Sequence, residues 1–123
     1  MQTHPDYVDA AILLALDCGG SPDSVIAATD HINAGYADYA DWVHACDVLG
    51  RRGLIAEGQP LPTITTAGEC VVVDHGAALP PRHAAAKIRD ALATLPIVAE
   101  PVSPPEETVI ERAIATHREQ FWG

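Results

Sequence analysis

The fold is decided at Leu49-Gly50-Arg51-Arg52-Gly53-Leu54-Ile55, which continues after a loop as Ile64-Thr65-Thr66-Ala67-Gly68-Glu69. Two cations in the last turn of a predicted helix are favoured by the negative end of the helix dipole. Gly53 is placed to end that helix, because glycine accepts the left-handed backbone that helix ends often need. Residues 54–56 are then predicted as a short strand and residues 62–65 as its return, joined by a loop that contains glycine and proline. The stretch therefore predicts a helix that runs directly into a two-stranded hairpin.

The helix before this junction is predicted over residues 39–52. Asp38 is a capping residue, and Asp41 lies three residues later near the same positive helix end. The apolar stripe of this helix consists of Trp42, Ala45, Cys46 and Leu49. We therefore expect Trp42 and Cys46 to lie in the core.

Two further helices are predicted upstream. From Tyr7 to Leu16 apolar residues recur at steps of three and four, and Cys18-Gly19-Gly20 ends the pattern. The second helix begins at Ser21-Pro22-Asp23, which supplies a hydroxyl cap, a proline at the first helical position and an acid favoured by the dipole. It runs to about Asn33, and its buried side comprises Val25, Ile26, Thr29 and Ile32.

Downstream of the hairpin, three more helices are predicted. Thr66 and Glu69 match a capping box that opens the first, and Pro80-Pro81 opens the second, which continues to Leu95 until Pro96 stops it. Ser103-Pro104-Pro105-Glu106 repeats the capping signature before a last helix that runs to about Gln120. We predict a domain over residues 1–75 and a helical extension, a packing or dimerisation arm, over residues 76–123.

The last predicted helix carries an apolar stripe that must be buried. The residues proposed as a dimer helix are Ile110, Ile114, His117 and Phe121. The stripe either folds back on the same chain or pairs with a second one, and both alternatives stay open. Because symmetric dimers are common among soluble oligomers, a homodimer is expected.

The junction is similar to the L-x-x-x-G-L-(I/V) and (I/L)-T-x-x-G stretches of MarR-like and PadR-like winged-helix proteins, and this likeness covers about Val8 to Glu69. More loosely, Asp9 to Ala15 and Ala113 to Phe121 resemble the first and last helices of uncharacterised bacterial winged-helix proteins. The resemblance implies a mainly α fold: a winged helix, with a three-helix core and a two-stranded β-wing, and additional C-terminal helices. It also implies a transcriptional-regulator-like role, with the third helix in the DNA major groove and the wing near phosphates.

Charge opposes DNA binding. The chain has 123 residues, with 7 Lys and Arg against 17 Asp and Glu, for a formal net charge of -10. Residues 1–50 hold eight Asp and no Lys or Arg, so this half is expected to repel a phosphate backbone. The predicted partner face, which would meet nucleic acid or a protein, consists of Tyr36, Tyr39, Asp41, Val43, His44, Asp47, Arg51 and Arg52. The predicted wing tip, residues 57–62, carries no cation.

The sequence also argues against a membrane protein, a secreted protein, a metal-binding protein and an enzyme. The longest apolar stretch, Ala10 to Leu16, is far shorter than the roughly 20 residues of a membrane span, and the basic start of a secretory signal is missing, so we expect a cytoplasmic protein without membrane association. Cys18, Cys46 and Cys70 lack the short spacing of a zinc site, and no metal or cofactor is assigned. Neither Asp74-His75 nor the serines have a context that activates them, and the Gly19-Gly20 turn lacks the lysine of a P-loop, so no catalytic residue is assigned and an enzyme is not expected.

Three hypotheses about function follow. The first is a winged-helix regulator that binds DNA as a dimer. The second is a protein-interaction module or nucleic-acid mimic, in which the acidic face bearing Tyr36 and Tyr39 binds a basic protein, since aromatic residues dominate interaction hot spots. In the third, the acidic face is merely solvated and the last helix binds a partner. The charge favours the second.

Overall fold

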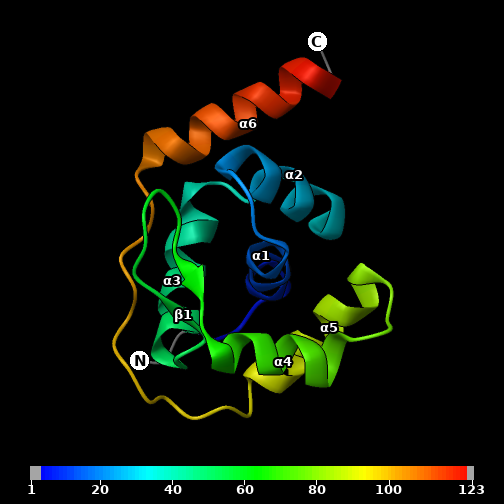
Figure 1. The fold of residues 1–123 in the computed structure, drawn as a ribbon, viewed down its shortest axis with the longest axis vertical. Coiled ribbons are helices and arrows are strands. Elements are labelled where there is room, and N and C mark those ends of the chain that lie inside the picture. Colours follow the sequence, from blue (N-terminus) through cyan, green and yellow to red (C-terminus); the bar gives the residue numbers. More distant parts are fainter. Residues whose placement is uncertain (1–3, 122–123) are drawn as a thin grey trace.

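The computed structural model describes the backbone of residues 4–121 and the side chains of residues 4–120. In this part of the chain the fold is mainly helical, with one small antiparallel sheet (Figure 1). The elements, in order, are α1 (Tyr7–Cys18), α2 (Pro22–Asn33), α3 (Tyr39–Arg51), β1 (Ile55–Ala56), β2 (Thr63–Ile64), α4 (Thr66–Gly76), α5 (Pro81–Leu92) and α6 (Glu107–Phe121). In the sheet, Ile55 pairs with Ile64 and Ala56 with Thr63, so the hairpin forms where the junction predicts it.

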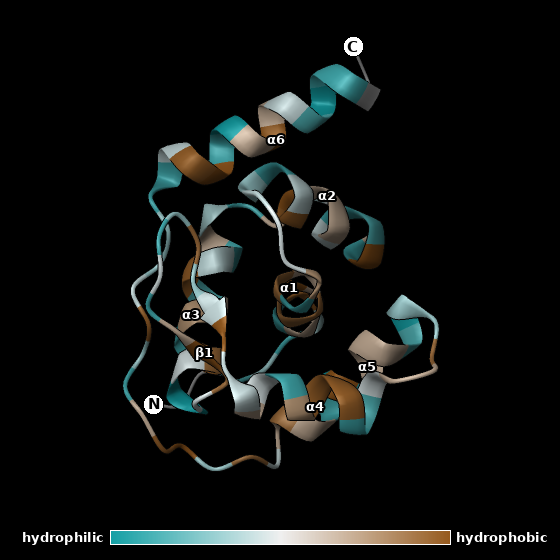
Figure 2. Ribbon diagram, viewed as in Figure 1, coloured by the Kyte–Doolittle hydropathy of each residue, from teal (hydrophilic) through white to brown (hydrophobic). Residues whose placement is uncertain are grey.

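Helix α1 is the centre of the core. Residues 9–13 are fully buried, and α1 packs against α2, α3, α4 and α5, which surround it (Figure 1). Figure 2 shows hydrophobic segments on α1 and on the helices around it. The core includes Trp42 and Cys46, as predicted, together with residues of α5 and α6. No helix among residues 4–121 is long and apolar enough to cross a membrane.

Local signals set most helix starts. The Ser21 hydroxyl accepts a hydrogen bond from the backbone N–H of Ser24, and the Asp38 carboxylate accepts one from the N–H of Asp41. The cap of α4 corrects the predicted one by a residue: Thr65 accepts from the N–H of Gly68 at 3.1 Å and donates to the Gly53 carbonyl at 2.7 Å. Thr65 is favoured over Thr66 because its hydroxyl also satisfies a carbonyl at the end of the α3 turn.

The two C-terminal helices are shorter than predicted. Helix α5 ends at Leu92 rather than Leu95, where the Arg52 guanidinium binds the Leu92 carbonyl at 2.8 Å. Helix α6 begins at Glu107, after an extended segment that contains Pro104 and Pro105. Proline disfavours helical backbone in the residue that precedes it, so residues 103 and 104 stay outside the helix. This segment, residues 97–106, is called the strap below. Nothing in the fold tests the predicted division at residues 75 and 76, which stays a prediction.

Candidate interaction surface

The outward side of α3 forms the narrow strip that the sequence proposes as a partner face. Val43 is 41% exposed, and Asp47 and Arg51 follow it at steps of four residues. The Arg51 Nε donates to the Asp47 carboxylate at 2.7 Å, so this cation is already paired within the helix. Tyr39, Asp41 and His44 lie half-buried at the edges of the strip.

Arg52 does not belong to this face, which corrects the prediction. It is 8% exposed, and its Nε and Nη1 donate to the carbonyls of Leu92 and Val48 at 2.8 and 3.0 Å. Helical rotation places residue 52 on the inner side, where five guanidinium N–H groups can satisfy carbonyls that the helix ends leave open. Arg52 therefore ties α3 to α5 and offers no charge to a partner.

The N-terminus of α1 brings two carboxylates to His44, of which Asp6 is exposed at the edge of the strip and Asp9 is buried. His44 Nδ1 lies 2.9 Å from Asp9 Oδ1, and His44 Nε2 lies 3.6 Å from Asp6 Oδ2. Asp9 is fully buried, and its second oxygen accepts from the backbone N–H of Asp6 at 2.7 Å. Sequence reasoning placed Asp9 in the first helix but missed this pairing. The sequence did contain a signal for this pairing: Asp9 lies inside the apolar pattern of the first helix. A carboxylate buried there needs a hydrogen-bonding partner.

Burial and charge oppose one another at this pair. Burial lowers the pKa of His44, but the hydrogen bond and charge of Asp9, with the charges of Asp6 and Asp47, outweigh it and leave the pKa raised. Burial raises the pKa of Asp9, and the bonds from Asp6 and His44 only partly oppose that effect. The folded pair therefore binds protons more tightly than the two isolated groups.

Asp6, Asp9 and His44 are also the side chains among residues 4–120 that could hold a metal, since one ligand atom of each lies within 4.8 Å of the others. Two observations oppose a cation there. Asp6 caps α1 and Asp9 lies in its first turn, where the helix dipole is positive, and both oxygens of Asp9 already accept hydrogen bonds. The cluster is better described as a capping box that also fixes a histidine.

The strap covers another side of α3. The backbone N–H groups of Val98 and Ala99 donate to the Arg51 carbonyl, and that of Val102 donates to the Cys46 carbonyl at 3.1 Å. A Cβ at Gly50 would lie 2.5 Å from the Val102 nitrogen, so α3 and the strap touch backbone to backbone. With α1 on one side and the strap on another, only the strip around Val43 faces outward.

The loop of the β1–β2 hairpin, residues 57–62, is folded onto the body of the protein rather than extended from it. Leu61 and Pro62 near its tip are buried, and the Glu57 carboxylate accepts from the N–H of Ser103 in the strap at 2.8 Å. The residues from 57 to 62 contribute a carboxylate and no cation, as the sequence indicates. This loop therefore offers no cationic side chain to a phosphate.

Helix α6 packs within its own chain. Ile110 is fully buried, Ile114 and His117 are half-buried, and the helix lies along α2 (Figure 1). The Tyr36 hydroxyl lies 2.7 Å from His117 Nδ1, and the Arg118 guanidinium stacks 5.2 Å from the centre of the Tyr36 ring. Tyr36 therefore fastens α6 instead of standing free as a partner anchor. The Phe121 side chain lies outside the described residues.

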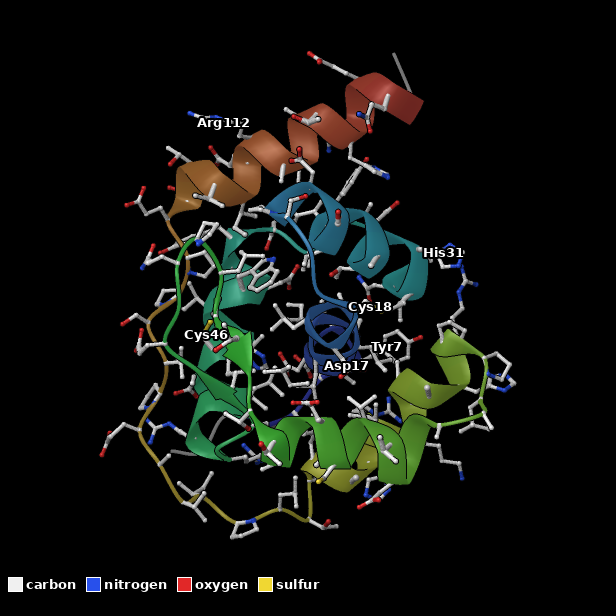
Figure 3. All side chains as sticks on the ribbon, viewed as in Figure 1. Tyr7, Asp17, Cys18, His31, Cys46 and Arg112 are labelled. Carbon is white, nitrogen blue, oxygen red and sulfur yellow. The ribbon has the colours of Figure 1, made fainter. Side chains whose placement is uncertain are left out.

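The cysteines do not converge. Cys18 and Cys70 are exposed, whereas burial, with smaller contributions from the charges of Glu57 and Asp9, raises the pKa of Cys46 to about 12. A thiol with that pKa stays protonated at neutral pH and is a poor metal ligand or nucleophile. Figure 3 shows Cys18 and Cys46 on separate elements.

Comparisons with family models, with curated proteins and with solved structures find no match.

Proposed function

We propose that this chain is a non-catalytic winged-helix protein whose acidic α1–α3 face binds a basic protein partner. The order of three helices and a two-stranded hairpin supports the winged-helix assignment. The observation that carries the function is the composition of the outward strip. Exposed Val43 lies one helical turn before Asp47, which pairs with the cation Arg51, and the carboxylates of Asp6 and Asp41 lie near His44 at the edge of the strip.

This face has the features of a small charge-guided docking surface. An exposed aliphatic residue supplies apolar area, and the acids around it steer a cationic partner and set its orientation. Because charges on a surface are screened over about 10 Å at 0.1 M salt, binding should weaken as salt rises.

DNA binding is the second candidate, and the element order favours it. A docked duplex would face a strip of carboxylates on α3. The strap covers another side of this helix and reduces the surface open to DNA, and the wing tip carries no cation. Arg52, one of the two arginines on α3 and its turn, is buried. Favourable phosphate contacts would have to come from other parts of the chain.

Fluorescence anisotropy with labelled oligolysine and labelled genomic DNA fragments, each at low and high salt, separates the two candidates. We expect salt-sensitive binding of oligolysine and none of DNA. Preferential binding of DNA at low salt would overturn the proposal in favour of a regulator.

A matched pair of double variants distinguishes a docking face from net charge. D6N/D47N and D17N/D74N each remove two exposed or half-exposed carboxylates, but only the first pair lies on the proposed face. We expect D6N/D47N to weaken oligolysine binding about tenfold, since each lost ion pair contributes up to about 1 kcal/mol, and D17N/D74N to weaken it far less. Equal weakening by both would mean that bulk charge, and not this face, binds the peptide.

A further inference from the structure

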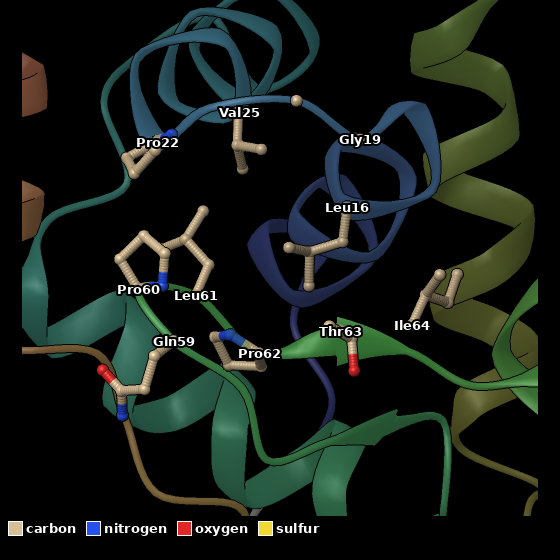
Figure 4. Close-up of a pocket in the computed structure, with 11 residues that line it drawn as sticks. Leu16, Gly19, Pro22, Val25, Gln59, Pro60, Leu61, Pro62, Thr63 and Ile64 are labelled. Atoms are coloured by element: carbon tan, nitrogen blue, oxygen red, sulfur yellow. The ribbon is translucent and has the colours of Figure 1, made fainter.

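A cavity of about 320 Å³ lies between the wing and the turn that joins α1 to α2. Leu16, at the end of α1, and Val25, in α2, form one wall, and wing residues 59–64 form the other (Figure 4). Its volume is at the lower end of the range for small-molecule sites, which is about 300–1,000 Å³. The two walls come from segments more than thirty residues apart in the sequence.

The lining is apolar and carries no ionisable side chain. Leu16, Val25 and Leu61 are buried core residues, and prolines 22, 60 and 62 complete much of the surface. Polar side-chain groups come from Gln59 and Thr63, both exposed at the wing. Asp23 and Arg112 line a separate hollow that shares Pro22 and Pro60 with this cavity. A charged ligand would lose its hydration without gaining a counter-charge.

The local backbone favours a preformed cavity. Gly19 and Gly20 have φ values of +75° and +103°, which side chains rarely adopt, so this part of the wall stays bare. A Cβ at Gly58 would lie 2.7 Å from the Leu61 carbonyl oxygen, so the wing turn is tight. The prolines in residues 60–62 restrict the chain that forms the opposite wall.

We propose that this cavity binds a small, uncharged, mainly apolar molecule whose polar group faces the Gln59 and Thr63 rim. Such a ligand contacts both the α1–α2 turn and the wing, and therefore holds the wing in its folded-back position. The site is independent of the acidic α1–α3 face, since its lining includes no residue of that face.

Three matched probes test the class of ligand: 4-fluorobenzyl alcohol, 4-fluorobenzoate and 4-fluorobenzylamine have the same ring and differ in charge. For molecules this small we expect a dissociation constant on the order of 1 mM for the alcohol and at least about tenfold weaker binding of both ions, measured by fluorine NMR. Equal or tighter binding of either ion would overturn the assignment to neutral ligands.

Amide chemical shifts locate the site. The alcohol should move the amide resonances of the non-proline residues among 16–25 and 59–64, and shifts confined to other residues, or none at all, would overturn the proposal. A filling variant provides a second test: Val25→Phe should abolish these shifts, while Val73→Phe, at a position 63% exposed on α4, should leave them intact. If Val25→Phe does not fold, Thr63→Phe fills the cavity from its exposed rim, and retention of full binding by a folded filling variant would contradict the site.

Discussion

At the scale of single residues, two neighbouring arginines, Arg51 and Arg52, have different structural roles because they lie on different sides of the helix end. Arg51 lies on the surface and pairs with Asp47, while Arg52 is buried and binds two carbonyls. Removal of a buried guanidinium leaves its carbonyl acceptors without hydrogen-bond partners, which is costly. An ion pair on the surface contributes little to the free energy of unfolding.

Arg52→Ala is expected to lower the free energy of unfolding by about 2–4 kcal/mol, because it removes two buried hydrogen bonds and the packing of the side-chain stem. Arg51→Ala should leave the urea midpoint almost unchanged. Urea unfolding followed by circular dichroism compares the two neighbours. Similar losses in both variants would contradict the burial of Arg52.

His44 makes stability depend on pH. Its raised pKa means that the folded protein holds this proton more tightly than the unfolded chain, so the stabilisation is complete below the unfolded pKa of about 6.5. It is lost as the pH rises through the folded pKa. The raised pKa of Asp9 acts in the same direction at lower pH.

Wild-type protein should therefore become less stable as the pH rises above about 6.5, and His44→Gln, which cannot titrate, should lose most of this slope. Urea unfolding at several pH values measures both. The Asp9→Asn variant keeps an acceptor for the Asp6 N–H and provides a control that removes the charge of the pair without removing the ring. An unchanged slope in His44→Gln would assign the pH dependence to other groups.

At the scale of elements, the close contact between the strap and α3 requires a glycine, Gly50, which has no side chain. Gly50 lies inside α3, where alanine would ordinarily favour the helix by about 1 kcal/mol. Here the added Cβ would meet the Val102 nitrogen at 2.5 Å and the Val102 side chain at 2.9 Å.

Gly50→Ala should therefore destabilise the protein by about 1–3 kcal/mol despite its helix propensity, and it should speed hydrogen exchange at the Val102 amide. Gly35→Ala is the control, because a Cβ there meets nothing within 4 Å. Thermal unfolding and amide exchange give the two readouts. A stable Gly50→Ala variant with a protected Val102 amide would show that the strap does not require this contact.

Helix α6 makes its main contact within the chain. Ile110 is fully buried by residues of the same chain, and Tyr36 bonds to His117. Ile110, one of the residues proposed for the homodimer contact, is therefore buried within its own chain. The predicted homodimer stays a prediction.

Ile110→Ala should reduce the free energy of unfolding by about 2–4 kcal/mol, the usual cost of emptying a core position, while the mass in light scattering stays that of the wild type. A change in mass at unchanged stability would instead place Ile110 at a subunit interface. The two measurements are made on the same samples.

At the scale of the whole molecule, net charge dominates. With a formal charge of -10 on 123 residues, the folded state contains more acids than its cations can neutralise. Self-repulsion of this kind destabilises a compact state and is screened by salt.

Sodium chloride should accordingly raise the unfolding temperature, by about 2–5 °C between low and physiological ionic strength. Differential scanning calorimetry over a salt series measures it. A variant such as D17N/D74N, with two fewer negative charges, should show a smaller rise, and a fall in unfolding temperature with salt would mean that attractive ion pairs dominate.

Sequence patterns were enough to predict the order of the helices, the hairpin after Gly53 and the caps at Ser21 and Asp38. The same patterns predicted the burial of Trp42 and Cys46. These features depend on residues within a few positions of one another, so local periodicity and capping chemistry were sufficient to predict them.

Other features depend on contacts between elements that lie far apart in the sequence. The Asp9–His44 pair joins residues 35 apart, and the bond from Arg52 to Leu92 joins residues 40 apart. The same holds for the strap on α3, the folded-back hairpin loop and the packing of α6 in its own chain. Each depends on how whole elements pack against one another, and no periodicity within a single helix records which neighbour its face will meet.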